Sequence, residues 1–149
     1  MREFVRVTRL VDLMKPGTTE SLYGNGELIL VIDHEPNTLL MTRAILEERN
    51  YRVVCANTGM EALAKFAAFS EEMRNVRVVL IDIGLPDMKG VALIREIKKL
   101  EKDTLFIASI GQGELVPVSE LRALDVTNFV SKPYDPLKLL KTLRQVLEH

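Results

Sequence analysis

Residues 79–90 read Val79-Leu80-Ile81-Asp82-Ile83-Gly84-Leu85-Pro86-Asp87-Met88-Lys89-Gly90. The apolar residues at the start of this stretch continue a run that begins at Val76 and that only Arg77 interrupts. Such a run is typical of a strand covered on both faces in a parallel sheet. Asp82 ends the run, and the glycine and proline residues after it predict a loop before a helix starts near Gly90. A carboxylate is therefore expected at the C-terminal end of a buried strand.

Strand and helix patterns alternate on both sides of this stretch. Short apolar or β-prone runs predict strands, and each is followed by apolar residues at helical spacing. The other strands are expected over 28–32, 52–56, 105–108 and 128–131, and the other helices start near 36, 58, 114 and 135. The expected inward faces include Leu40, Met41, Ala44 and Ile45 in the first helix and Leu140, Leu143 and Leu147 in the last. This alternation predicts an α/β fold, a doubly wound five-stranded parallel sheet sandwiched by five helices.

The first 26 residues do not follow this pattern. Apolar residues at helical spacing favour a short amphipathic helix, and they are Phe4, Val7, Leu10, Val11 and Met14. A polar, glycine-containing stretch over 18–26 reads as a linker. We therefore expect an N-terminal helical or disordered extension over 1–26 and one domain over 27–149. The extension is either a frayed chain end, the tail of an upstream domain or a dimerising helix.

The composition narrows the class of protein. Of the 149 residues 47% are apolar and 28% are charged, which fits one domain with a substantial core. The net charge of −1 and the lack of a basic run argue against direct nucleic-acid binding. No apolar stretch reaches the roughly 18 residues that a membrane span needs. Cys55 is the only cysteine, so no internal disulfide can form, and a cytoplasmic location is expected.

Polar side chains stand where four of the predicted strands end. Asp33 follows the first strand, Asp82 the third, Ser109 the fourth and Lys132 the fifth. In parallel sheets of this kind, ligands bind beyond the C-terminal ends of the strands. Two close carboxylates repel each other, and a hard cation such as Mg²⁺ relieves that repulsion. With an ammonium and a hydroxyl beside them, the set predicts a site that accepts a phosphoryl group on a carboxylate.

These motifs resemble the receiver domain of two-component response regulators, in particular the chemotaxis-regulator-like type. The resemblance spans about Leu28 to Leu147, and its motifs are Ile29–Pro36, Val79–Gly90, Ser109 and Phe129–Tyr134. It implies the flavodoxin-like receiver fold and a place in a phosphorelay. The implied phosphodonor is a sensor histidine kinase or a histidine phosphotransfer protein, and the implied target is an output domain or protein. A homodimer is among the expected partners, and the chain is either a stand-alone receiver or part of a hybrid sensor kinase or larger regulator.

The resemblance also implies roles for single residues. Asp82 matches the phosphoacceptor, Ser109 the switch hydroxyl, Lys132 the cation that pairs with the phosphoryl group, and Phe129 the switch aromatic. The peptide bond from Lys132 to Pro133 is expected to be cis. The domain is expected to be a signalling module, whose only chemistry is self-catalysed phosphoryl transfer and autodephosphorylation.

The metal site matches the family in part. Asp33, Asp82 and the backbone carbonyl of Gly84 match ligands of Mg²⁺ or Mn²⁺. His34 stands where the family usually has a second aspartate, so the pocket loses one negative charge. Neutral imidazole suits transition metals better than Mg²⁺, and a reduced metal affinity is expected. His34 is either a ligand or a neutral residue at the rim, and Glu35 could supply the missing carboxylate.

Two functional hypotheses follow from these residues. The first is a phosphorylatable receiver, which the acidic pair, the hydroxyl and the lysine favour. The second is an atypical receiver-like protein-interaction module with weak or no phosphorylation, which His34 favours. An Asp-nucleophile phosphatase would need an aspartate at Gly84. Dinucleotide binding is disfavoured because no Gly-x-Gly-x-x-Gly motif follows the first strand.

Overall fold

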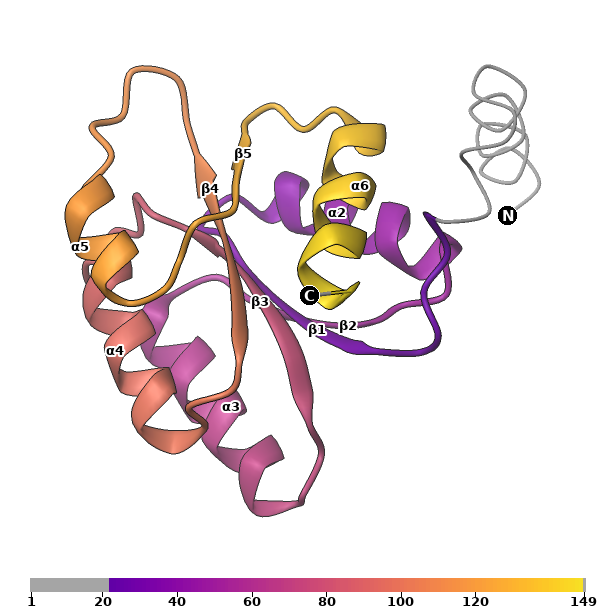
Figure 1. Ribbon diagram of the computed structural model, residues 1–149, viewed down its shortest axis with the longest axis horizontal. Coiled ribbons are helices and arrows are strands. Elements are labelled where there is room, and N and C mark those ends of the chain that lie inside the picture. Colours follow the sequence, from indigo (N-terminus) through magenta and orange to yellow (C-terminus); the bar gives the residue numbers. More distant parts are fainter. Residues whose placement is uncertain (1–21, 149) are drawn as a thin grey trace.

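The computed structural model describes residues 22–148, in which five strands and five helices alternate along the chain (Figure 1). They are β1 (Leu28–Ile32), α2 (Pro36–Glu48), β2 (Arg52–Ala56), α3 (Gly59–Glu71), β3 (Val76–Asp82), α4 (Gly90–Leu100), β4 (Leu105–Ile110), α5 (Val118–Ala123), β5 (Phe129–Ser131) and α6 (Pro136–Glu148). The strands pair in parallel in the order β2-β1-β3-β4-β5. This is the flavodoxin-like order, and the predicted fold is confirmed.

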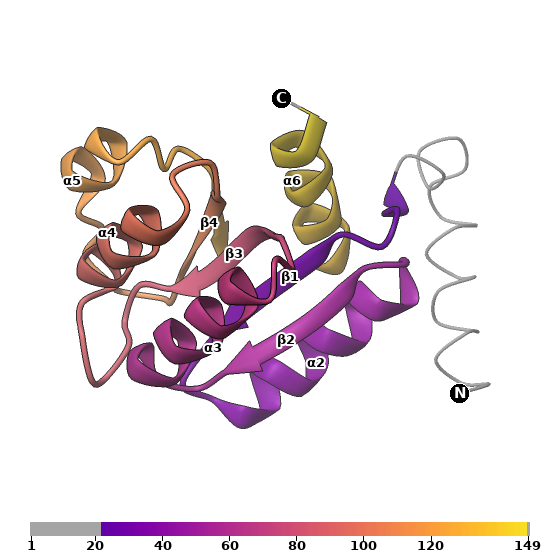
Figure 2. The ribbon, with the colours of Figure 1, turned by 90° about the horizontal axis from the view of Figure 1, so that it is seen from below.

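Helices cover both faces of the sheet. α2 and α6 lie on one face, and α3, α4 and α5 lie on the other, as the two views in Figures 1 and 2 show. Because side chains alternate along a strand, the buried residues of β1 divide between two cores. Leu28, Leu30 and Ile32 belong to the core under α3, α4 and α5. Ile29 and Val31 belong to the core under α2 and α6.

Arg77 is accommodated by an irregularity in the pairing of β1 with β3. Leu28 pairs with Val76 and Ile29 with Val78, so the register skips Arg77. The bulge leaves the arginine exposed, while the apolar residues on both sides of it stay buried. The charged residue within this apolar run is therefore compatible with the assignment of residues 76–82 as a buried strand.

The predicted inward face of α2 is wrong at Leu40 and Met41, while Ile45 packs against the core as expected. Leu40 is 66% exposed and Met41 is 43% exposed. The helix instead buries Leu39, Thr42 and Leu46. Thr42 can be buried because its hydroxyl donates to the carbonyl of Thr38 at 2.7 Å. A polar residue thus belongs to the buried face, which made that face look less apolar in the sequence than it is in the fold.

Two boundaries also differ from the prediction. α5 starts at Val118 rather than near 114, because Pro117 disfavours helical geometry in the residue before it. Leu22 is buried in the core under α2 and α6. The N–H of Gly24 donates to the carbonyl of Arg49 at 2.7 Å. The boundary predicted at residue 27 therefore falls inside packed structure, while the helix predicted over 4–14 lies outside the described residues.

Within residues 22–148, no helix is both long and apolar enough to cross a membrane.

Three helices each end in a turn of the same type, and none of these turns has a glycine at its left-handed position. Asn50, Met73 and Asp125 follow α2, α3 and α5 with φ values of 67°, 58° and 62°. At Met73 the backbone N–H donates to Ser70 O at 3.1 Å, and the next N–H donates to Phe69 O at 2.8 Å. This pair of bonds is the Schellman motif, whose left-handed position is usually a glycine because other residues are strained there.

We expect the Met73→Gly substitution to stabilise the domain. Met73 is 93% exposed, so its side chain contributes little packing. The relief of left-handed strain should exceed the extra entropy of glycine in the unfolded chain, for a net gain of about 0.5–1 kcal/mol. Urea unfolding monitored by circular dichroism measures this free energy. The matched control is Ala64→Gly at an exposed position within α3, which should lose about 1 kcal/mol. A loss at both positions would contradict the prediction.

Candidate functional site

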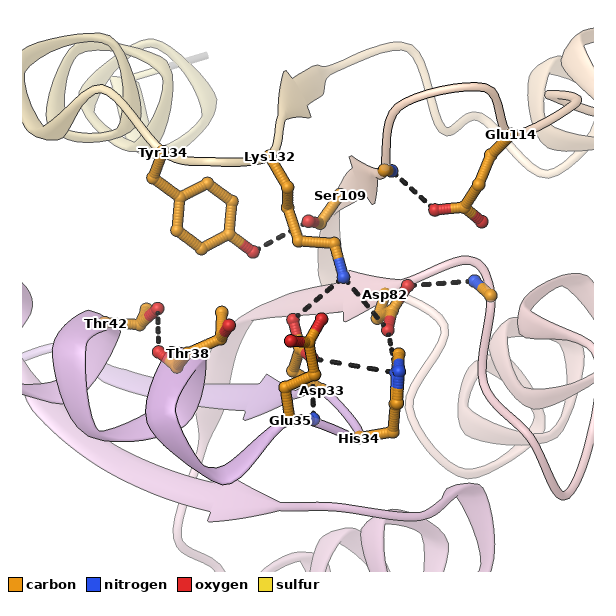
Figure 3. Close-up of polar contacts among 12 residues, drawn as sticks. Asp33, His34, Glu35, Thr38, Thr42, Asp82, Ser109, Glu114, Lys132 and Tyr134 are labelled. Carbon is orange, nitrogen blue, oxygen red and sulfur yellow. Dashed lines mark hydrogen bonds and ion pairs between the residues drawn. The ribbon is translucent and has the colours of Figure 1, made fainter.

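The C-terminal edge of the sheet brings four of the predicted residues together (Figure 3). Asp33 follows β1, Asp82 ends β3, Ser109 lies near the end of β4, and Lys132 follows β5. Each stands two positions after a buried strand residue of the core under α2 and α6, and these residues are Val31, Leu80, Ile107 and Val130. Because the strand repeat is two residues, all four polar side chains point to the same face. β1 and β3 are neighbours at the point where the strand order reverses, which is where such sheets bind ligands.

Lys132 joins the two acidic side chains. Its Nζ lies 3.2 Å from Asp33 Oδ2 and 3.2 Å from Asp82 Oδ2. Both carboxylates are only 1% exposed. Burial alone would lower the pKa of Lys132, but the attraction of the two carboxylates outweighs it and the pKa is raised. The pair and its cation therefore form one buried ionic cluster.

Burial raises the pKa of Asp33. The backbone N–H of Glu35 donates to Asp33 Oδ1 at 3.0 Å and opposes that shift, as does the charge of Lys132, but burial prevails. Ionised Asp33 is thus held in place at a cost in stability, and additional positive charge beside it would relieve that cost.

Both oxygens of Asp82 are contacted by donors. The N–H of Gly84 donates to Oδ1 at 2.9 Å. On Oδ2, the ring Nδ1 of His34 lies at 2.8 Å, in addition to the lysine. The hydrogen bond requires the proton on Nδ1, while the His34 side chain stays 43% exposed. His34 is therefore not only a rim residue, because it contacts the expected phosphoacceptor directly.

The residues present fit a divalent cation. Among residues 22–148, Asp33, His34 and Glu35 form a group whose possible ligand atoms all lie within 4.8 Å of one another. Carboxylate oxygens suit Mg²⁺ or Mn²⁺, and an imidazole nitrogen shifts the preference toward transition metals. The raised pKa of Asp33 also fits a site that binds positive charge. The backbone of Gly84 lies beside Asp82, and the role of its carbonyl as a ligand stays a prediction.

The hydroxyl of Ser109 is bound by a residue that the sequence analysis did not single out. Ser109 is fully buried, and the Tyr134 hydroxyl donates to its Oγ at 2.7 Å (Figure 3). Burial raises the pKa of Tyr134, so the phenol keeps its proton. Tyr134 occurred in the sequence motif only as the residue after the Lys132–Pro133 pair, whose peptide bond is cis as expected.

Two acidic residues on loops were also missed. Asp87 accepts hydrogen bonds from the N–H groups of Gly59 and Met60 at 2.8 and 3.0 Å, which lowers its pKa and ties the loop after β3 to the start of α3. Glu114 accepts from the N–H of Gly111. It also lies so close to Gly84 that a Cβ there would be 2.5 Å from its Oε2. These pairs are distant in sequence or lie on irregular loops, so no spacing could have indicated them.

Phe129 stands apart from the other predicted site residues. It begins β5 and pairs with Ala108, one position before the pair formed by Ser109 and Val130. Because side chains alternate, it points to the opposite face from Ser109. Its side chain is 36% exposed, and its role as the switch aromatic stays a prediction.

Comparison with known proteins decides the family. Residues 29–144 match the model of the response regulator receiver domain. The chain belongs to this family. It is therefore a receiver domain of two-component phosphorelay signalling, a class of signalling domains rather than of conventional enzymes.

Three proteins illustrate the similarity. The chain is 26% identical over 122 residues to the chemotaxis protein CheY of Thermotoga maritima, covering 81% of this chain and 98% of that one. It is 32% identical over 127 residues to the sensor kinase CckA of Brucella abortus, covering 85% of this chain but 13% of the kinase. A crystal structure of a CheY-like receiver domain protein from Methanospirillum hungatei superposes with a TM-score of 0.73 at 30% identity, covering 83% and 94% of the two chains. Receiver domains thus match this chain both as nearly whole proteins and as small parts of long ones.

Proposed function

We propose that Asp82 of this receiver domain accepts a phosphoryl group from the phosphohistidine of a sensor histidine kinase or a histidine phosphotransfer protein. One observation carries the proposal. The buried Asp82 carboxylate is fixed by the Gly84 N–H at 2.9 Å, with the Lys132 ammonium 3.2 Å from its other oxygen. A carboxylate held in one position beside a cation can attack phosphorus as the cation balances the incoming negative charge.

The transfer exchanges one bond to phosphorus for another. A phosphorus–oxygen bond forms to Asp82 as the phosphorus–nitrogen bond to the donor histidine breaks, and the departing imidazole takes up a proton. Lys132 is placed to pair with the transferred group, and Ser109 supplies a hydroxyl on the next strand. The phosphorylated domain then changes conformation and acts on an output domain or protein in the cytoplasm.

Asp33, Asp82 and the Gly84 carbonyl would hold Mg²⁺ or Mn²⁺, with His34 or Glu35 beside them. The metal supplies positive charge that neutralises the oxygens of the phosphoryl group. His34 reduces the affinity for Mg²⁺, because it supplies an imidazole in place of a carboxylate and its Nδ1 contacts Asp82 Oδ2 at 2.8 Å.

Intact-mass spectrometry after incubation with acetyl phosphate and excess Mg²⁺ tests this function. The parent domain should gain the mass of one phosphoryl group, and Asp82→Asn should gain none. The matched control is Asp103→Asn, which removes an exposed aspartate at the opposite end of the sheet and should be phosphorylated like the parent. Phosphorylation that persists in Asp82→Asn would refute the assignment. A parent that gains no mass with either Mg²⁺ or Mn²⁺ would instead support the interaction-module hypothesis.

A further inference from the structure

The hydroxyl of Ser109 is already engaged in the structure. Under the proposed function this hydroxyl must donate a hydrogen bond to a phosphoryl oxygen on Asp82. In Figure 3 the Ser109 and Tyr134 hydroxyls point toward each other, and their oxygens lie 2.7 Å apart. Asp82 is contacted from other directions, by His34, Gly84 and Lys132. Ser109 Oγ thus accepts the hydrogen bond of Tyr134 in the unphosphorylated domain.

The contact between the two hydroxyls is buried. Ser109 is 0% exposed and Tyr134 is 8% exposed, so water does not compete readily for either group. The phenol is the stronger acid of the two, which makes Tyr134 the donor and the serine oxygen the acceptor. A buried hydroxyl without a partner is unfavourable, so the bond favours the side-chain rotamer of Ser109 that reaches Tyr134.

We propose that Tyr134 is a positioning residue that holds the Ser109 hydroxyl away from Asp82 until a phosphoryl group is bound. The inference rests on the proposed function of Asp82 and adds a regulatory contact to the same site. When the phosphoryl group is present, Ser109 turns about its Cα–Cβ bond, leaves Tyr134 and donates to a phosphoryl oxygen. The favourable energy of the tyrosine contact is then subtracted from the energy of binding the phosphoryl group.

The opposite role predicts an effect of opposite sign. If Tyr134 kept its bond while Ser109 donated to the phosphoryl group, the two hydroxyls would form a chain, and each bond would strengthen the other. Removing the phenol oxygen would then weaken phosphoryl binding. If Tyr134 restrains Ser109, removing the oxygen strengthens phosphoryl binding.

Titration with beryllofluoride, a phosphoryl mimic, in saturating Mg²⁺ distinguishes these roles. Tyr134→Phe should bind beryllofluoride about 3- to 10-fold more tightly than the parent, the factor expected for one modest hydrogen bond. The substitution keeps the ring that packs in the core and removes only the oxygen. In a Ser109→Ala background, the same substitution at Tyr134 should leave the affinity unchanged, because no hydroxyl remains to be released.

The result that overturns the proposal is equal or weaker binding by Tyr134→Phe while the parent binds, and that result leaves the function of Asp82 intact. A gain that persists in the Ser109→Ala background also overturns it, because the gain would not pass through Ser109. A parent that binds no beryllofluoride, and is not phosphorylated by acetyl phosphate, refutes the proposed function and this inference together.

Discussion

Replacing His34 with aspartate should raise the affinity of the domain for Mg²⁺ by about tenfold or more. The substitution puts a carboxylate in place of an imidazole ring whose Nδ1 lies 2.8 Å from Asp82 Oδ2 and 3.8 Å from Asp33 Oδ1. It also removes the imidazole from the Asp82 oxygen that it contacts. A tenfold gain needs only about 1.4 kcal/mol, which is small beside the attraction between a divalent cation and a carboxylate added next to the buried Asp33 and Asp82. Isothermal titration with Mg²⁺ measures the change.

His34→Asn is the matched control for this substitution. Asparagine has the size of aspartate but adds no charge, so it should bind Mg²⁺ no more than a few-fold more tightly than the parent. Because the imidazole nitrogen suits transition metals, the preference of the parent for Mn²⁺ over Mg²⁺ should shrink in His34→Asp. If His34→Asp and His34→Asn gain equally, the missing charge is not the cause of weak binding. If neither gains, the metal does not bind beside residue 34.

The strands and the four polar residues at their ends could be predicted because they depend on short-range regularities. A run of apolar residues identifies a covered strand. Because side chains two positions apart in a strand point the same way, Asp33 points to the same face as Val31, and Asp82 to the same face as Leu80. The parallel arrangement places those ends on one edge without any knowledge of loops. The family motif could therefore be assigned from residues 28–147 before any contact was known.

The features that were missed depend on contacts that no local pattern encodes. The buried face of α2 includes Thr42, whose polarity is masked by a bond to its own helix. The ends of α2, α3 and α5 have no glycine to signal them. Tyr134 lies 25 residues after Ser109 in the sequence, and the hydrogen bond between their side chains depends on the position of the loop after β5. Such contacts are set by tertiary packing, and in this domain one of them involves the buried hydroxyl of Ser109.

Replacing Lys132 with methionine should destabilise the domain by about 2–4 kcal/mol at neutral pH. The side chain of Lys132 is only 13% exposed, and without it Asp33 and Asp82 would remain buried with no cation between them. Loss of one partner from a buried ionic cluster is costly because the other charges stay desolvated. Denaturant unfolding in the presence of a chelator measures the effect without interference from metal ions. The matched control is Lys99→Met, which breaks an exposed pair with Glu96 and should cost less than about 0.5 kcal/mol.

The loss of stability caused by Lys132→Met should depend on pH, and the pKa shifts of Asp33 and Lys132 predict the sign of that dependence. Burial already raises the pKa of Asp33 above its ordinary value of 3.8, and removing the lysine raises it further. The folded variant then holds protons that the unfolded chain releases, so its stability falls as the pH rises through the pKa range of Asp33. As the pH falls toward 3.8 and below, the difference in stability between the parent and the variant should shrink, since Asp33 becomes protonated in both. Because the pKa of Lys132 is raised, its contribution to stability is complete below pH 10.5 and falls as the pH rises from there. The contribution is gone above the folded pKa, where the two proteins should converge again. A difference in stability that stayed constant across this range would mean that the loss does not come from the charge of Lys132, and that the carboxylates it joins do not need that charge.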